Sequence, residues 1–377
     1  MNFFQRIVLI VAAAVVAASC GNKKDEPQPL AKRTLLVYMV ATNSMSGQDA
    51  TDIAEMKTAL ASYGKSDCRL LLYRASYNHD PQLIELRYNS AEKATATITL
   101  KTYDPTPSLS VTKQRFMEVM ADAQTFAPAH DYGLVLWSHA AGWASTLPKS
   151  STGKKPRYFG IDYSATMPID SLADALPGNV FSFIYADACY MGGIEVAYEL
   201  RNKTHYLIAS PAEMPYDGMP YDVTVPLFFE DVVDIPRICD KVYDFYKGTS
   251  SGLTLSVVDC TQLDALADVC RAIHSSAKQL ESTAGLQYYN RATLTGTRIF
   301  YDFGQYTRLI ATDESLIGSF NEALERAITY KVATPKIFGI TVNPDTYSGL
   351  STSIYGRNSQ DNDALYSTLQ WYRAIHD

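Results

Sequence analysis

Short apolar segments alternate with segments of helical period through the first half of this chain, and this alternation limits the possible folds more than any other feature. Runs typical of buried strands occupy Thr34–Val40, Arg69–Tyr73, Leu83–Tyr88, Ala96–Tyr103, Tyr132–Trp137, Val180–Tyr185 and Tyr206–Ala209. Helical patterns lie between several of them, at Gly47–Tyr63, Thr112–Thr125 and Gly193–Asn202. Apolar strands that alternate with helices predict an α/β fold, with a largely parallel sheet flanked by helices on both faces.

The pattern changes after about residue 215. Helices are expected at Ile235–Tyr246, Leu263–Leu280 and Ser315–Ala327, with strands at Leu253–Val258 and Ile337–Val342. We therefore expect an α/β domain over residues 34–215 and a C-terminal α+β subdomain over residues 216–377 that packs on it. The chain has 377 residues, 47% of them hydrophobic, which is enough for a core of this size.

The first 19 residues have the pattern of an export signal. Arg6 precedes an apolar run over residues 7–18, which is shorter than a membrane-spanning helix. The small residues before Cys20 resemble a bacterial lipoprotein signal, in which the cysteine is lipidated and begins the mature chain. An ordinary secretory signal is the alternative. Residues 20–33 then form a polar tether, and we expect a lipid anchor in the outer membrane of the cell envelope, with surface exposure left open.

The net charge of the chain argues against one class of binding partner. The chain has 33 Lys and Arg against 40 Asp and Glu, a net charge of −7, so no nucleic-acid partner is expected.

Five cysteines remain besides Cys20, so at least one thiol has no partner within the mature domain. The sequence leaves open whether the other four form disulfides.

Two predicted strands end on reactive residues. Tyr132–Trp137 runs into Ser138 and His139, and Val180–Tyr185 runs into Asp187 and Cys189. Parallel strands have their carboxyl ends at one edge of a sheet, where ligands bind, so His139 and Cys189 are expected to meet there. A cysteine and a histidine form a nucleophile and its base. The helix after Cys189 is expected to lower the pKa of the thiol, and the backbone N–H of Cys189 can help to hold an oxyanion.

His139 precedes Cys189 by 50 residues, the spacing that caspase-type proteases show. The closer resemblance is to the clostripain family of cysteine peptidases, which share the caspase-like fold. The segments that carry it are LVLWSHAAGW at 134–143, DACYMGGIEVAYEL at 187–200, ASPAEMPYDGMPY at 209–221 and SGLSTSIY at 348–355. Together they extend over nearly the whole mature chain.

This resemblance implies a cysteine endopeptidase that cleaves protein or peptide substrates after Arg or Lys. The family's catalytic pair corresponds to His139 and Cys189, and its acidic specificity residue to Asp187. A carboxylate suits a pocket for a basic side chain; the alternative is that Asp187 only caps the following helix. The family's second oxyanion donor, the N–H after the histidine, corresponds to Ala140. No cofactor is certain, although some relatives bind calcium.

Family members are often matured by cleavage between the histidine and cysteine segments. Here the interval contains the loop 144–157, which has the Ser, Thr, Pro, Gly and Lys content of an exposed, protease-sensitive segment. Its candidate processing residues are Lys149, Lys154, Lys155 and Arg157. We expect self-processing in this loop.

The chain departs from the family pattern beside the histidine. The family commonly has Gly after the histidine and Asp or Asn before it, whereas this chain has Ala140 and Ser138. Alanine is disfavoured there only if the backbone needs a positive φ angle. These departures motivate a second hypothesis: a catalytically impaired surface lipoprotein of the same fold that binds peptides or glycans. A transpeptidase that uses the same pair of residues is a third.

Overall fold

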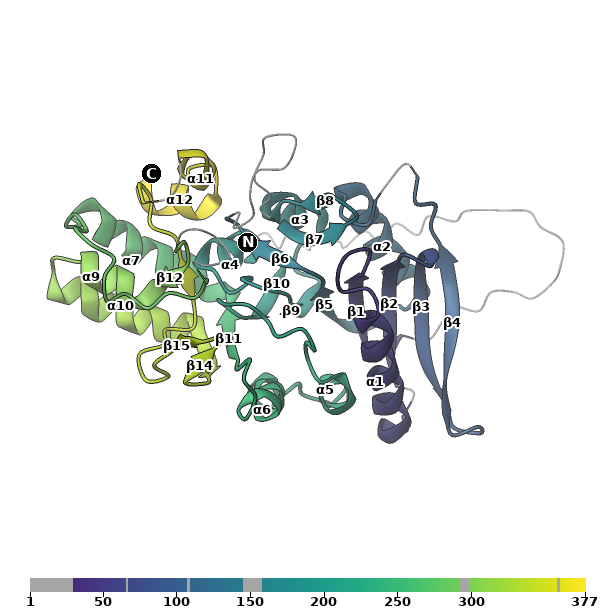
Figure 1. The fold of residues 1–377 in the computed structure, drawn as a ribbon. Helices are drawn as coiled ribbons and strands as arrows, with labels where there is room; N and C mark the ends of the chain where they lie inside the picture. Colours follow the sequence, from purple (N-terminus) through teal and green to yellow (C-terminus); the bar gives the residue numbers. More distant parts are fainter. Residues whose placement is uncertain (1–29, 66, 107–108, 145–157, 292–297, 358–359) are drawn as a thin grey trace, which may run out of the picture.

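The computed structural model describes residues 30–65, 67–106, 109–144, 158–291, 298–357 and 360–377, and its centre is a nine-stranded sheet (Figure 1). The strands, in their order across the sheet, are β13 (Ile328–Ala333), β11 (Thr254–Asp259), β10 (Thr204–Ala209), β9 (Phe181–Asp187), β5 (Ala129–Trp137), β1 (Ala31–Val40), β2 (Cys68–Ser76), β3 (His79–Asn89) and β4 (Ala94–Thr102). The central strands from β10 to β2 are parallel, and both ends of the sheet are antiparallel. The predicted α/β fold with a largely parallel sheet is confirmed.

Helices cover both faces of this sheet (Figure 1). One face packs against α1 (Gln48–Tyr63), α5 (Tyr221–Phe228) and α6 (Ile235–Tyr246). The other packs against α2 (Lys113–Phe126), α3 (Ile169–Ala175), α4 (Ile194–Leu200), α7 (Leu263–Ser275), α9 (Phe303–Ile310), α10 (Glu314–Ala327) and α12 (Gln370–His376). Successive side chains of β1 alternate between the two cores: Leu35 and Val37 belong to one, and Leu36 and Tyr38 to the other. Burial on both faces explains why the strands are apolar throughout.

The second half of the chain continues the same sheet. β11 pairs with β10 and β13 pairs with β11, both antiparallel, so the sheet crosses the domain boundary expected at residue 215. Two small sheets complete this half, β12 (Tyr301–Asp302) with β16 (Ser351–Thr352), and β14 (Lys336–Ile337) with β15 (Ile340–Thr341). The last pair replaces the single strand expected near residues 337–342, and a short helix α11 (Gln360–Tyr366) lies near the C-terminus. The division into two domains stays a prediction.

A three-stranded sheet of β6 (Ala140–Gly142), β7 (Tyr158–Asp162) and β8 (Ala165–Met167) follows His139 directly. Sequence reasoning did not anticipate it. Gly142 has a φ angle of +59°, and a Cβ atom there would lie 2.6 Å from the backbone oxygen of Tyr190. This glycine therefore allows the segment after His139 to approach the segment after Cys189 closely.

Gly133, in β5, provides a test of sheet packing. It pairs with Phe183 of β9, and a Cβ atom would lie 2.2 Å from the Phe183 ring. We expect Gly133→Ala to destabilise the protein by about 1–3 kcal/mol, because the ring cannot move out of a packed core without strain. Urea unfolding of the two proteins measures the difference.

Gly248→Ala is the matched control, since a Cβ atom at that position would have nothing within 4 Å and the φ angle of Gly248 is not left-handed. Its stability should stay within about 1 kcal/mol of wild type. Equal effects of the two substitutions would contradict the packing argument.

Candidate active site

The register between β5 and β9 places His139 and Cys189 at equivalent positions. Trp137 pairs with Asp187 in the parallel ladder, and each strand ends at that pair. His139 and Cys189 each lie two residues further along, and neighbouring strands are about 4.8 Å apart. The two residues therefore lie at the same edge of the sheet, as the sequence predicted.

The Cys189 thiol is half-buried under the segment that follows β10. Its Sγ accepts a hydrogen bond from the Met214 N–H at 3.3 Å and is 3.8 Å from the Met214 carbonyl oxygen. Burial raises the pKa of the thiol to about 12, and the charges of Glu213 and Asp187 add to this effect. The expectation that the following helix lowers this pKa is wrong for this structure. α4 begins only at Ile194, and burial is the largest influence on this pKa.

His139 is held by a serine that sequence reasoning missed. The His139 Nε2 atom lies 2.8 Å from Oγ of Ser44, an exposed residue in the loop after β1. Burial lowers the pKa of the imidazole, which favours the neutral form that a general base needs. Among the described residues, no hydrogen bond joins the side chains of His139 and Cys189.

The backbone around His139 is fixed from the end of β1. The Ser138 Oγ donates to the Val40 carbonyl at 2.9 Å and accepts from the Ile161 N–H at 3.3 Å. The φ angle of Ala140 lies outside the left-handed region, which in this segment is adopted by Gly142. Alanine is therefore unstrained at 140, and serine at 138 has a structural role, so the departures from the family pattern fit this backbone.

Asp187 is a buried carboxylate next to the thiol. Its Oδ2 accepts hydrogen bonds from the Met219 N–H at 3.0 Å and from the Tyr221 hydroxyl at 2.8 Å. These partners belong to the segment that leads into α5, not to α4, so the hydrogen bonds do not have the pattern of a helix cap. Burial raises the pKa of Asp187 to about 6, although both hydrogen bonds act to lower it.

Two further carboxylates approach Asp187 from α1. The Asp52 Oδ2 accepts from the Trp137 indole N–H at 2.6 Å, and burial together with the charge of Asp187 raises its pKa to about 8. The Glu55 Oε2 accepts from the Tyr221 N–H at 3.0 Å, and burial raises its pKa as well. The site thus contains a group of carboxylates on one side of the thiol. Sequence reasoning found only Asp187.

An ion pair lies on another side of Cys189. Arg291 Nε donates to Glu213 Oε1 at 2.9 Å, and the Tyr190 hydroxyl donates to the same oxygen at 2.9 Å. Tyr190 has a φ angle of +59°, a strained conformation for a residue with a side chain. The Arg291 charge lowers the pKa of Cys189 and so partly offsets Glu213.

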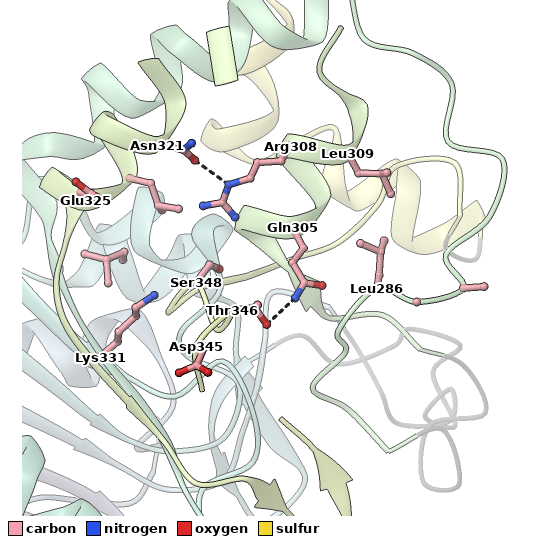
Figure 2. Close-up of a pocket in the computed structure, with 14 residues that line it drawn as sticks. Leu286, Gln305, Arg308, Leu309, Asn321, Glu325, Lys331, Asp345, Thr346 and Ser348 are labelled. Carbon is pink, nitrogen blue, oxygen red and sulfur yellow. Dashed lines mark hydrogen bonds between the residues drawn. The ribbon is translucent and has the colours of Figure 1, made fainter. Parts of the chain in front are cut away.

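A cavity of about 1020 Å³ is lined by none of His139, Asp187 or Cys189 (Figure 2). Arg308 and Lys331 point into it from α9 and β13, and Arg308 Nε donates to Asn321 Oδ1 at 2.7 Å. The carboxylates Glu325 and Asp345 line it as well, so the cavity holds charges of both signs. Because neither His139 nor Cys189 lines it, we assign this cavity no part in the catalytic site.

Several predicted residues lie outside the described part of the chain: Cys20, Lys149, Lys154, Lys155 and Arg157. The described cysteines, Cys68, Cys189, Cys239, Cys260 and Cys270, are all free thiols. No group of three or more His, Cys, Asp or Glu side chains in the described residues is placed to hold a metal ion. None of the described helices has the length and apolar character needed to cross a membrane.

Comparison with known proteins agrees with this geometry. The sequence profile of the Clostripain family matches residues 37–365. The X-ray structure of an inactive zymogen C11 protease from Parabacteroides distasonis is 31% identical, covers 93% of this chain and 99% of its own, and superposes with a TM-score of 0.79. A secreted C11 cysteine protease from Bacteroides thetaiotaomicron, in complex with an irreversible peptide inhibitor, is 28% identical over 92% of this chain and 99% of its own, with a TM-score of 0.78.

A third structure, a clostripain from Bacteroides thetaiotaomicron in complex with the peptide inhibitor BTN-VLTK-AOMK, is 33% identical over 58% of this chain and 98% of its own, with a TM-score of 0.51. A comparison with curated protein sequences found no match. The fold and the cysteine–histidine edge define a cysteine peptidase of caspase-like architecture. The chain belongs to the clostripain family of cysteine peptidases, also called C11.

The raised pKa of Asp52 predicts a pH-dependent stability. The folded protein keeps this proton up to about pH 8, whereas the unfolded chain releases it near pH 3.8, so wild type loses stability as pH rises between these values. We expect the stability advantage of Asp52→Asn over wild type to grow by up to about 1.4 kcal/mol per pH unit in this window. Urea unfolding at several pH values between 5 and 8 measures it.

Asp268→Asn is the control, because that carboxylate is 70% exposed on α7. Its stability difference from wild type should change little with pH. An Asp52→Asn difference that is equally flat would show that Asp52 is ionised in the folded protein.

Proposed function

We propose that this protein is a cysteine endopeptidase that cleaves after Arg or Lys, with Cys189 as the nucleophile and His139 as the general base and acid. The observation that carries the proposal is the Trp137–Asp187 register, which puts both residues at one edge of the sheet with a buried carboxylate beside them. Membership of the family supports the same roles.

The chemistry follows from these positions. His139 takes the proton of the Cys189 thiol, and the sulfur attacks the carbonyl carbon of the scissile bond. The backbone N–H groups of Cys189 and Ala140 stabilise the oxyanion. His139 then protonates the leaving amine, the C–N bond breaks, and water hydrolyses the thioester with His139 again as base. A thiol with a pKa near 12 depends on this base, because it is not ionised at neutral pH.

The carboxylates support the specificity for basic residues. An Arg or Lys side chain that reaches Asp187 forms a charge-assisted hydrogen bond and relieves the repulsion between the charges of Asp187 and Glu55. The related clostripain from Bacteroides thetaiotaomicron was solved with an inhibitor whose peptide ends in Lys. That agrees with a pocket of the same kind here.

Self-processing in the loop 144–157 agrees with where the loop begins and ends. Gly142 of β6 pairs with Tyr158 of β7, so both ends of the loop lie in the small sheet beside His139. Burial raises the pKa of Tyr158 to about 12, and the proximity of Cys189 contributes to this shift. The candidate thiol is therefore close to the root of the loop that holds Lys149, Lys154, Lys155 and Arg157.

The relative from Parabacteroides distasonis was solved as an inactive zymogen. A zymogen is a precursor that needs activation, so this relative supports the processing proposed for the loop 144–157. We further propose that Cys20 carries a lipid anchor that holds the enzyme at the cell envelope. The secreted state of the Bacteroides relatives supports export but not the anchor itself.

Self-processing is tested by intact mass and N-terminal sequencing of the mature chain and its Cys189→Ala variant. We expect wild type to split after Lys149, Lys154, Lys155 or Arg157 and the variant to stay whole, because the variant has no nucleophile.

Cys68→Ala is the matched control, since Cys68 is also a half-buried free thiol, and it should process like wild type. Processing by Cys189→Ala would contradict the role of Cys189. If all three stay whole while wild type still hydrolyses Arg substrates, only self-processing is contradicted; if wild type hydrolyses none, the peptide-binding alternative replaces catalysis.

The role of Asp187 is tested with a pair of substrates that have arginine or its uncharged analogue citrulline before the scissile bond. We expect Asp187→Asn to lower kcat/KM for the arginine substrate by roughly 10- to 100-fold, the worth of one hydrogen bond to a charged group. The citrulline substrate should change by less than about threefold. For wild type, the preference for arginine should rise between pH 5 and 7, as Asp187 with its pKa of about 6 loses its proton.

An equal loss for both substrates would show that Asp187 acts only on the fold. A preference that does not change with pH would show that another carboxylate binds the charge.

A further inference from the structure

A pocket of about 230 Å³ opens at the sheet edge on the far side of His139 from Cys189. Its walls come from the ends of β1 and β2 and from the turn between β7 and β8, and include Thr42, Tyr77, Asp80, Asp162 and Tyr163. None of the catalytic roles above uses these residues.

The order of the strands relates this pocket to the catalytic pair. Cys189 follows β9 and His139 follows β5, and the next strands in the same parallel part of the sheet are β1 and β2. Ser44, which holds His139, lies two residues after Thr42 of the pocket wall. Along the sheet edge, Cys189 therefore comes first, His139 second and the pocket third.

The order of Cys189, His139 and this pocket along the sheet edge indicates which part of a substrate reaches the pocket. His139 must give its proton to the leaving amine, so the part of the substrate after the scissile bond departs on the His139 side of Cys189. Three strand spacings separate β9 from β2, which is about 14 Å, and an extended peptide advances about 3.3 Å per residue. The third or fourth residue after the scissile bond reaches the pocket.

Two exposed tyrosines form the rim. Tyr77 and Tyr163 are 49% and 59% exposed, and their rings meet edge to face with centroids 5.5 Å apart. Tyr163 has a φ angle of +54°, and its N–H donates to the Thr42 carbonyl at 2.9 Å. Tyr163 lies in the two-residue turn that joins β7 to β8, where a positive φ angle is common, and this turn holds its ring at the surface.

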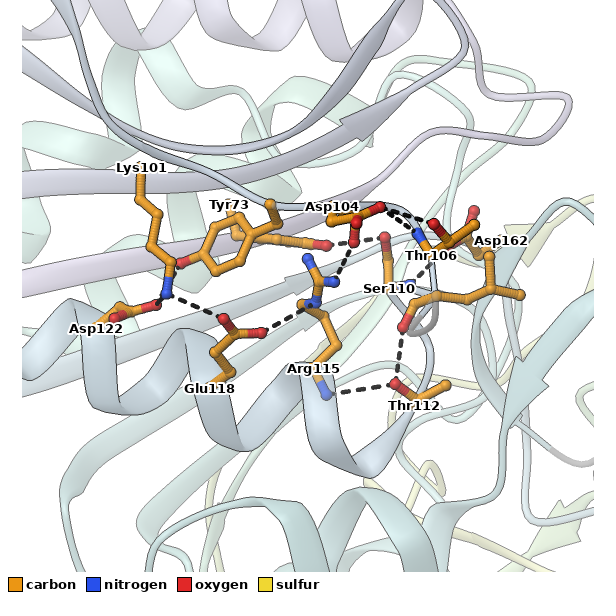
Figure 3. Close-up of polar contacts among 12 residues, drawn as sticks. Tyr73, Lys101, Asp104, Thr106, Ser110, Thr112, Arg115, Glu118, Asp122 and Asp162 are labelled. Atoms are coloured by element: carbon orange, nitrogen blue, oxygen red, sulfur yellow. Dashed lines mark hydrogen bonds and ion pairs between the residues drawn. The ribbon is translucent and has the colours of Figure 1, made fainter.

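The charged residues of the pocket indicate which kind of substrate side chain it would bind. Asp162 is buried, and its Oδ2 accepts from the Ser110 N–H at 2.6 Å, an interaction drawn in Figure 3. Its Oδ1 accepts from the Thr42 hydroxyl at 2.5 Å. Asp80 lies exposed at the mouth, and no Lys or Arg is among the described lining residues. Tyrosine faces with two carboxylates attract a cation through both cation–π and Coulomb interactions.

We propose that this pocket is a substrate subsite that binds a Lys or Arg side chain at the third or fourth position after the scissile bond. This inference rests on the proposed function, since it needs Cys189 and His139 to act at the scissile bond. It predicts that the enzyme is selective for side chains on both sides of the scissile bond.

The test compares two kinds of substrate for the mature chain. An arginine amide of aminomethylcoumarin has no residue in the pocket, whereas internally quenched peptides place Lys or the uncharged norleucine at the third and fourth positions after Arg. Mass spectrometry assigns cleavage to the first bond. We expect wild type to prefer Lys over norleucine by roughly 5- to 10-fold in kcat/KM, the worth of a partly exposed cation–π contact with a nearby carboxylate.

The variant Tyr77→Ala with Asp80→Asn should lose this preference and hydrolyse the coumarin substrate like wild type. Tyr355→Ala removes an equally exposed tyrosine elsewhere, 49% exposed, and should keep the preference.

Two results would overturn the subsite: no preference for Lys in wild type, or an equal preference in the double variant. Failure of wild type to hydrolyse the coumarin substrate would instead overturn the proposed function, and the subsite with it.

Discussion

The parallel pairing of β5 with β9 is the constraint on which the rest of the site depends. It sets Trp137 beside Asp187, and every other position at this edge follows from that register. A shift by one residue would turn His139 or Asp187 to the opposite face of the sheet. Gly133, which leaves room for the Phe183 ring between the same strands, helps to fix the register.

The sheet edge that this register creates buries ionisable groups, which costs free energy of folding. Asp52, Asp187 and the Cys189 thiol are all buried strongly enough to have raised pKa values, so each resists ionisation in the folded chain. The two carboxylates therefore reduce stability at neutral pH, whereas the thiol is protonated in both the folded and the unfolded chain at that pH. Proteins commonly accept such a cost where a bound partner relieves it. A positively charged substrate side chain would do so for the carboxylates. The imidazole of His139 would accept the proton of the thiol when the substrate is bound.

The sequence predicted the central sheet and the placement of His139 and Cys189 at one edge of it, because both depend on apolar strands and on the geometry of parallel strand ends. It did not predict β13, whose burial alternates, or α5, which contains Pro226 in its interior. Asp52 and Glu55 were missed because polar residues on an amphipathic helix are usually exposed. Ser44 belongs to a loop without any pattern, and the high thiol pKa depends on burial under Met214, which the sequence does not encode locally.

The central claim is that Cys189 is the nucleophile of a site for basic side chains. The direct measurement is labelling of the mature chain with a lysine-containing peptidyl acyloxymethyl ketone, followed by intact mass and peptide mapping. The thiolate displaces the carboxylate leaving group and forms a stable thioether. The account predicts one adduct, on Cys189, that is lost in His139→Ala and is much weaker when aspartate replaces lysine in the reagent. An adduct on Cys68, Cys239, Cys260 or Cys270, no adduct, or equal labelling by both reagents would contradict it.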